Sequence, residues 1–215
     1  MYLTKVDLAI CMTILGYDIP GEFDVDEYVE EFLKAPSDAN VFEHLETQGI
    51  LEKYEGRFRV SALTQHVFSI IQQNQVKIVI QKTTTKETRI LYARGDDYLC
   101  VDREKEGFRV LLLPILPFAI GAYAKMLEAI PDVMSAESKN IWTDDAVIIT
   151  CDIISNLKRV QLFITKNGYT KIIQQEDVCF QYFTEERCVN YLTAMLLEQL
   201  RERSGQENGI LHKEG

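Results

Sequence analysis

Hydrophobic and polar positions divide the chain into a helical N-terminal part and two strand-rich parts. Up to about residue 75, apolar residues recur at intervals of three and four, which is the spacing of an amphipathic helix. From Val76 onward the interval changes to two, which is typical of half-buried strands. The sequence therefore predicts an α+β protein.

Four helices and one hairpin are predicted in the first 75 residues. Thr4 is placed to cap the first helix and Gly16 to end it. The second helix is predicted to begin at Asp24 or Asp26 and to end before Pro36, and the third covers residues 37–47. The fourth is predicted to begin at Ser61 or Thr64 and to continue through Ile71. Between the last two, a turn at Glu55-Gly56 joins two short strands, so that residues 37–60 form a unit of one helix and one wing-like hairpin.

The strand-rich part is predicted as two successive units, each an antiparallel meander followed by a helix. In the first unit, strands at residues 76–81, 89–94, 98–101 and 108–113 precede a helix that begins at Pro114. In the second unit, strands at residues 146–154, 160–166, 169–175 and 178–183 precede a helix over 184–203. The predicted organisation is an N-terminal half (1–130), a connector (131–145), a C-terminal half (146–203) and a flexible tail (204–215).

Composition and charge narrow the range of partners. The 215 residues are 47% hydrophobic, enough for a substantial core, and carry a formal net charge of -10. Such acidity disfavours nucleic acid and anionic membranes. The longest apolar run, residues 110–123, is short for a bilayer and contains Pro114 and Pro117, and the N-terminus lacks a signal-peptide pattern. We expect a cytoplasmic protein with no membrane insertion.

The search for catalytic and metal-binding motifs is negative. No phosphate-binding glycine loop, zinc-protease motif or nucleophile elbow is present. The five cysteines are scattered and predicted to be small buried apolar residues, and His44 and His66 have no ligand partners at suitable spacing. The adjacent carboxylates at 96–97, 144–145 and 185–186 are interpreted as turn and helix caps. We therefore expect no enzyme activity, no catalytic residues, no metal and no cofactor.

The hairpin around Asn167-Gly168 supplies a candidate docking surface. A two-residue turn there would place Phe163 opposite Ile172 on one face of the sheet. The remaining side chains predicted on that face are polar: Gln161, Thr165, Thr170 and Gln174. Large apolar groups framed by polar ones often mark a docking surface, and these six residues are the predicted partner-binding site. The alternative is that helices cover both faces of the sheet.

The order of short motifs resembles that of the EspG-like secretion chaperones. These motifs are Leu45-x-x-x-Gly49-Ile50-Leu51, the glycine turn at Gly56, the period-two strand at residues 76–80, Ala93-Arg94-Gly95-Asp96, and the apolar run 109–114 leading into a helix. The resemblance covers roughly residues 1–130, and beyond them only the repeated order of sheet and helix. This chain is shorter than the best-known members and richer in Ile, Lys and Tyr.

The resemblance implies a bacterial cytosolic chaperone of type VII (ESX) secretion, with two pseudo-symmetric halves and no catalytic site. Its partner would be a helical, WXG-like secreted protein whose apolar tip it keeps soluble. The alternative is a ligand-sensing transcriptional regulator, supported by Arg57 and Arg59 on the wing but disfavoured by the acidic helix that carries Asp38, Glu43 and Glu46. A hydrolase using His66 or a cysteine has no supporting constellation.

Overall fold

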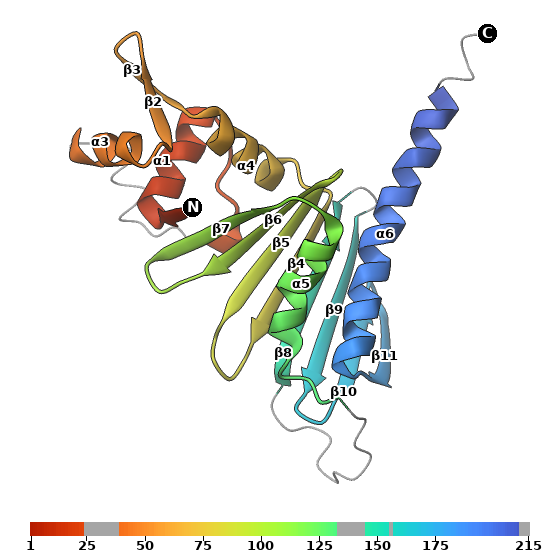
Figure 1. Cartoon of the computed structure of the whole chain (residues 1–215). Helices are drawn as coiled ribbons and strands as arrows, with labels where there is room; N and C mark the ends of the chain where they lie inside the picture. Colours follow the sequence, from red (N-terminus) through yellow and green to blue (C-terminus); the bar gives the residue numbers. More distant parts are fainter. Residues whose placement is uncertain (24–38, 133–144, 155–156, 211–215) are drawn as a thin grey trace.

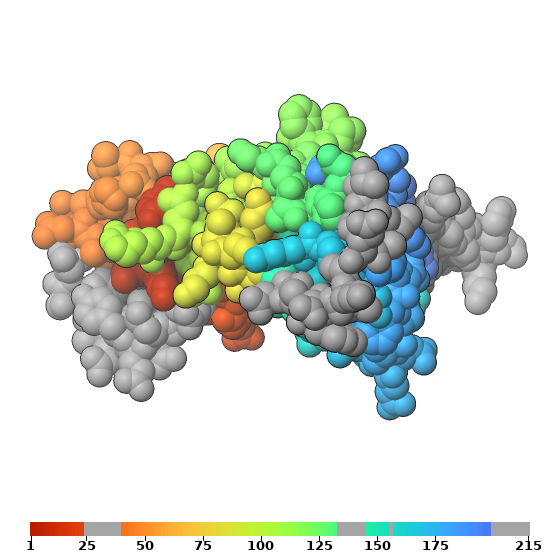
Figure 2. Space-filling view, turned by 90° about the horizontal axis from the view of Figure 1, so that it is seen from below, coloured from red at the N-terminus to blue at the C-terminus, as the bar shows by residue number. Residues whose placement is uncertain are grey.

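The computed structural model describes residues 1–23, 39–132, 145–154 and 157–210, with side chains to residue 198. Within these residues the protein is α+β, as the sequence predicts. A small helical layer lies at the N-terminal end of the molecule, and a large antiparallel sheet with two further helices on one of its faces forms the rest (Figure 1). Seen from below, the layer and the C-terminal helix stand at opposite ends (Figure 2).

The N-terminal layer begins with a short strand and a capped helix. Strand β1 (Tyr2–Thr4) pairs with β7 (Gly107–Leu113) of the large sheet, a contact that the sequence did not predict. Helix α1 (Lys5–Leu15) follows directly, and its capping box is complete, because Thr4 accepts from the Asp7 amide and Asp7 accepts from the Thr4 amide. Gly16, at φ +68°, ends the helix as predicted.

The helix-and-wing unit is also present. It comprises α3 (Ala39–Thr47), β2 (Leu51–Tyr54) and β3 (Arg57–Val60), and it lies in the chain between η1 (Gly21–Phe23) and α4 (Ala62–Gln72). Glu55 and Gly56 both have positive φ, which is the requirement of the tight hairpin turn predicted there. The helix predicted to begin at Asp24 or Asp26 and its neighbours Ser37 and Asp38 lie outside the described residues.

Nine strands form one sheet in the order β1-β7-β6-β5-β4-β8-β9-β10-β11. The first meander comprises β4 (Val76–Lys82), β5 (Thr88–Arg94), β6 (Asp97–Arg103) and β7 (Gly107–Leu113), followed by α5 (Leu116–Leu127). The second comprises β8 (Asp145–Ile153), β9 (Lys158–Thr165), β10 (Tyr169–Gln174) and β11 (Asp177–Tyr182), followed by α6 (Glu185–Ile210). The two meanders join where β4 pairs with β8, so the predicted repeat shares a single sheet.

Two hydrophobic cores lie on the two faces of this sheet. The first core packs α5 and α6 against both meanders, with Tyr123 and Leu192 among the buried side chains. The second core packs α1, α3 and α4 against the opposite face of the first meander, where Tyr92 and Phe108 are buried. Among the described residues, no member of the second core comes from β8–β11. Within the described residues, helices therefore cover only one face of the second meander.

The C-terminal boundary differs from the prediction. Helix α6 continues to Ile210, whereas the sequence predicted an end at about Arg203 and a flexible tail from Ser204. Polar residues and glycine lower helix propensity, but extension of an existing helix needs no new nucleation. Most of the predicted connector, residues 133–144 with Trp142, lies outside the described residues.

Candidate functional site

The β9–β10 hairpin has a three-residue loop, Lys166-Asn167-Gly168, instead of the predicted two-residue turn. The Gly168 amide donates to the Thr165 carbonyl at 2.9 Å, and Gly168 adopts φ +81°. This is the turn in which a left-handed residue follows a type I turn. Its register pairs Phe163 with Lys171 and Ile172 with Leu162, so the predicted pairing of Phe163 with Ile172 is wrong.

A shift of one residue exchanges the faces of a strand, and it divides the six predicted partner-binding residues into two groups. Phe163, Gln161 and Thr165 belong to the face opposite α6, although Thr165 is buried at the turn. Ile172 and Thr170 are buried on the helix face, and Gln174 lines a cavity of about 200 Å³ beside α6. The structure therefore does not bring the six residues together on one surface.

The face opposite α6, hereafter the open face, consists of side chains from β8–β11 that no described helix covers. Two rows run across it in the observed register: Ile148, Phe163, Lys171 and Phe180 in one, and Thr150, Gln161, Ile173 and Val178 in the other. Most of these side chains are half-buried, and Val178 and Phe180 are 50% and 45% exposed. The open face thus alternates apolar and polar groups, with its apolar side chains accessible to a partner.

An aromatic cluster occupies the outer edge of the open face. The Phe180 ring stacks on Tyr169 with centroids 5.7 Å apart, and Tyr182 meets Tyr169 edge to face at 5.3 Å. Lys171 lies between this cluster and Phe163, with its Nζ 6.0 Å from the centre of the Phe163 ring. The sequence prediction assigned the wrong residues of β10 to this face and none of β11, because the assignment depends on the register of two hairpins.

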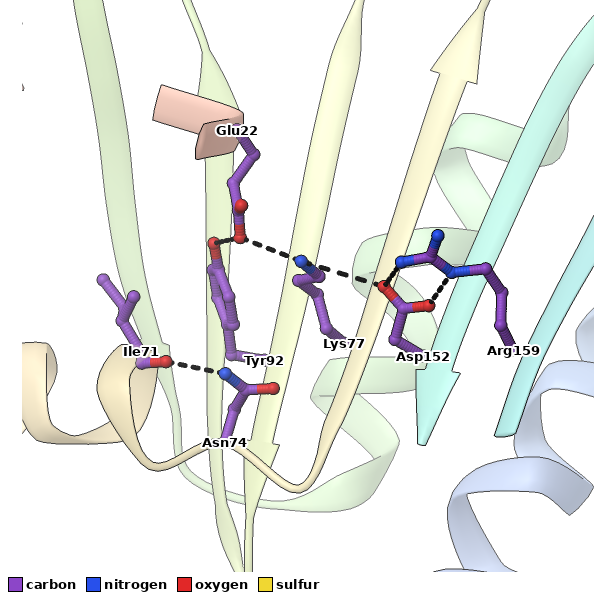
Figure 3. Close-up of polar contacts among 7 residues, drawn as sticks. All are labelled: Glu22, Ile71, Asn74, Lys77, Tyr92, Asp152 and Arg159. Carbon is purple, nitrogen blue, oxygen red and sulfur yellow. Dashed lines mark hydrogen bonds and ion pairs between the residues drawn. The ribbon is translucent and has the colours of Figure 1, made fainter. Parts of the chain in front are cut away.

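A ladder of charged side chains crosses the other border of this face (Figure 3). Arg159 of β9 donates two hydrogen bonds, of 2.6 and 3.2 Å, to the carboxylate of Asp152 of β8. Lys77 of β4 lies between two carboxylates, 3.8 Å from Asp152 and 3.2 Å from Glu22 of η1. The hydroxyl of Tyr92 donates to the same Glu22 oxygen at 2.8 Å.

The ladder ties the N-terminal layer to both meanders. Burial, followed by the charge of Glu22, raises the pKa of Tyr92 well above its usual value, so this hydroxyl remains a hydrogen-bond donor. The hydrogen bond to Asp152 raises the pKa of Arg159. Lys77, Glu22 and Asp152 are largely shielded from solvent, which makes their attraction less screened than that of a surface pair.

The remaining candidate side chains are the cysteines and the groups that could ligate a metal ion. Burial raises the pKa of Cys11, Cys100, Cys151 and Cys188 to about 12, so these thiols are poor nucleophiles, as predicted for buried apolar residues. Cys179 is the exception, since it is exposed on β11. In the part of the chain that the structure describes, no group of three His, Cys, Asp or Glu side chains could hold a metal ion.

Part of the positive charge of the wing is neutralised within the wing itself. Arg59 pairs with Glu52 at 3.0 Å and stacks over Tyr54, at 4.7 Å from the ring centre. Phe58 stacks on Phe42 of α3 at 5.4 Å, which fixes the hairpin against its helix. Of the two arginines that support the regulator hypothesis, one is thus engaged within the wing.

No protein-family model and no curated protein sequence matches the chain. Among the described helices, none is long and apolar enough to cross a bilayer. The open face and the charged ladder are therefore the structural features that bear on function.

Proposed function

We propose that this protein is a cytosolic secretion chaperone or adaptor that binds a helical substrate of a type VII system on the open face. The observation that carries the proposal is the accessible row of Ile148, Phe163 and Phe180 on a sheet whose opposite face packs against α5 and α6. A rigid sheet with one unpaired apolar face can hold an apolar helix without losing its own core. The type VII assignment rests on the sequence resemblance alone.

The chemistry of the face favours a particular kind of helix. An apolar stripe would contact Phe163 and Ile173, which lie on adjacent strands, while a carboxylate would pair with Lys171 between the aromatic side chains. Aromatic and cationic anchors of this type often dominate binding energy at protein interfaces. The substrate is therefore an amphipathic helix with at least one acidic residue beside its apolar stripe. The net charge of -10 keeps the chaperone itself soluble.

Co-expression with WXG-type substrates encoded in the same genome tests this proposal. The variant Phe163→Asp/Ile173→Asp should lose co-elution with the substrate, and Lys171→Glu should weaken binding about tenfold or more by opposing the substrate carboxylate. Leu111→Asp is the matched control, because Leu111 is an apolar residue of the same sheet, 43% exposed, but lies on β7 away from the open face.

The control variant should bind as the unmodified chain does. If every variant retains the substrate, the docking surface lies elsewhere and the proposal for the open face is wrong. If the unmodified chain binds none of the substrates, the secretion assignment itself fails.

A further inference from the structure

A cavity of about 300 Å³ lies between the C-terminal end of α5 and strands β4–β7 of the first meander. On the strand side, Arg89, Asp102 and Arg109 line it from one row of the sheet, where they lie opposite one another on β5, β6 and β7. On the helix side it is lined by Lys125 and Glu128. A cavity of this volume is at the lower end of the range for small-molecule sites.

One ion pair in the cavity is already complete. Arg89 donates to both carboxylate oxygens of Asp102, to one of them at 2.8 Å, and to the Ala122 carbonyl of α5. The side chains of Arg89 and Asp102 are only 17% and 22% exposed, and their hydrogen bond raises the pKa of Arg89. This part of the cavity is therefore fixed before a ligand enters, so that little conformational entropy is lost there on binding.

Other charged side chains of the cavity are more accessible. Arg109 pairs with Glu104 at 2.6 Å, but the side chain of Arg109 is 58% exposed. The charged groups of Lys125 and Glu128 form no ion pair within the part of the chain that the structure describes. Glu128 continues the helical backbone of α5, so its side chain lies about 5–6 Å from that of Lys125, three residues earlier. A positive and a negative group are thus available side by side.

The charges of the lining favour a ligand that carries both signs. Five basic and four acidic side chains line the cavity, so a ligand with one sign of charge would meet like charges beside its partners. The net charge of -10 further opposes the approach of an anion. A zwitterion has no net charge and finds a partner for each of its two charged groups.

We infer that this cavity binds a small zwitterion of the size of a dipeptide. Its carboxylate pairs with Lys125 and Arg109, and its ammonium group pairs with Glu128. An extended dipeptide carries these two groups about 7 Å apart, which is comparable with the separation of Lys125 and Glu128, whereas in a free amino acid they are attached to the same carbon atom. The inference is independent of the proposed function, which uses Phe163 and Ile173 on the opposite face of the sheet.

Three probes of similar size test the charge requirement: alanyl-alanine, N-acetyl-alanyl-alanine, which lacks the ammonium group, and alanyl-alaninamide, which lacks the carboxylate. In an NMR titration of the full chain, alanyl-alanine should shift the amide signals of Arg109 and Lys125 saturably, with a Kd on the order of 1 mM. The other two probes should bind at least tenfold more weakly. Equal binding of either of them, or no saturable shift with alanyl-alanine, would overturn the inference.

Two variants each remove one of the inferred contacts. Lys125→Met and Glu128→Gln should each weaken the binding of alanyl-alanine at least fivefold, while thermal unfolding stays nearly unchanged because both side chains are exposed. Lys166→Met is the matched control, since it removes an exposed lysine of the β9–β10 loop and changes the net charge as Lys125→Met does.

The control variant should bind alanyl-alanine as the unmodified chain does. An equal loss with Lys166→Met, or no loss with Lys125→Met, would contradict the inferred site. Lys125→Met and Glu128→Gln leave the open face intact and should still bind the helical substrate, so the two proposals fail separately.

Discussion

Phe163 and Ile172 occupy opposite faces of the same sheet, although they lie on adjacent strands and only one residue out of register. Phe163 pairs with Lys171 on the open face, whereas Ile172 pairs with Leu162 and is 5% exposed beneath the helices. The two side chains are therefore expected to respond in opposite ways to the same substitution.

Ile172→Asp should destabilise the fold strongly, and Phe163→Asp should not. An aspartate at position 172 would bury a charge without a partner, which costs about 3 kcal/mol or more of the free energy of unfolding. At position 163 the carboxylate reaches solvent and lies opposite Lys171, so a loss of about 1 kcal/mol or less is expected.

Urea denaturation of each single variant measures this difference. Leu162→Asp, the cross-strand neighbour of Ile172 on the helix face, should behave as Ile172→Asp does. Equal stabilities for the Phe163 and Ile172 variants would contradict the observed register.

Hydrophobic periodicity was sufficient to predict the strands of both meanders, but not the register that assembles the site. The alternation in residues 146–183 marks four strands whatever their pairing, because each strand buries one face. The Asn167-Gly168 pair fits both a two-residue turn and a three-residue turn that includes Lys166. The difference is one residue, yet it reverses which side chains of β10 face α6.

The charged ladder was beyond sequence reasoning for a different reason. Glu22, Lys77, Asp152 and Arg159 come from four elements, and their proximity follows from the pairing of β4 with β8 across the middle of the sheet. A polar residue within an apolar strand was the available signal, since Lys77 and Asp152 each interrupt a strongly apolar run. No local pattern indicates that these two strands are neighbours.

Removal of Lys77 should weaken the attachment of the N-terminal layer. Lys77→Met leaves Glu22 and Asp152 shielded from solvent without their shared cation, and we expect a loss on the order of 1 kcal/mol that shrinks at high salt. A double-mutant cycle with Glu22→Gln measures the coupling. As a control, Lys53→Met alters a lysine of the wing outside the ladder and should leave stability unchanged within about 0.5 kcal/mol.

Two glycines with similar backbone conformations should differ in their tolerance of alanine. Gly16 has φ +68° and open space around the missing side chain, so Gly16→Ala should cost about 1 kcal/mol from backbone strain alone. Gly168 has φ +81°, and an added Cβ would lie 2.5 Å from the Phe183 carbonyl oxygen, so Gly168→Ala must also displace the start of α6. In thermal unfolding, the melting temperature of Gly168→Ala should lie well below that of Gly16→Ala. The reverse order would contradict the three-residue turn.

Binding to duplex DNA should be absent. Helix α3 carries Glu43 and Glu46 and no Lys or Arg, and on the wing Arg59 is paired with Glu52. Phosphates therefore meet more negative than positive charge on this unit. Electrophoretic mobility shifts at low ionic strength should show no retained duplex, and the variant Glu43→Lys/Glu46→Lys should gain weak, salt-sensitive binding if charge is the reason. Salt-sensitive micromolar binding by the unmodified chain would instead favour the regulator hypothesis.

Alkaline pH should unfold the protein through its buried thiols. Burial raises the pKa of Cys11, Cys100, Cys151 and Cys188 from 9.0 to about 12. Between these two pKa values the thiols lose their protons in the unfolded chain but keep them in the folded chain. The contribution of these thiols to the free energy of unfolding is therefore fully present below about pH 9 and decreases as the pH rises. Each thiol contributes a slope of about 1.4 kcal/mol per pH unit to the free energy of unfolding, once the pH is well above 9.

Cys188→Ala should reduce this slope, measured by urea denaturation at several pH values, by one such contribution, whereas Cys179→Ala, at the exposed thiol, should leave it unchanged. An equal reduction by both variants would show that burial of the thiols is not the cause.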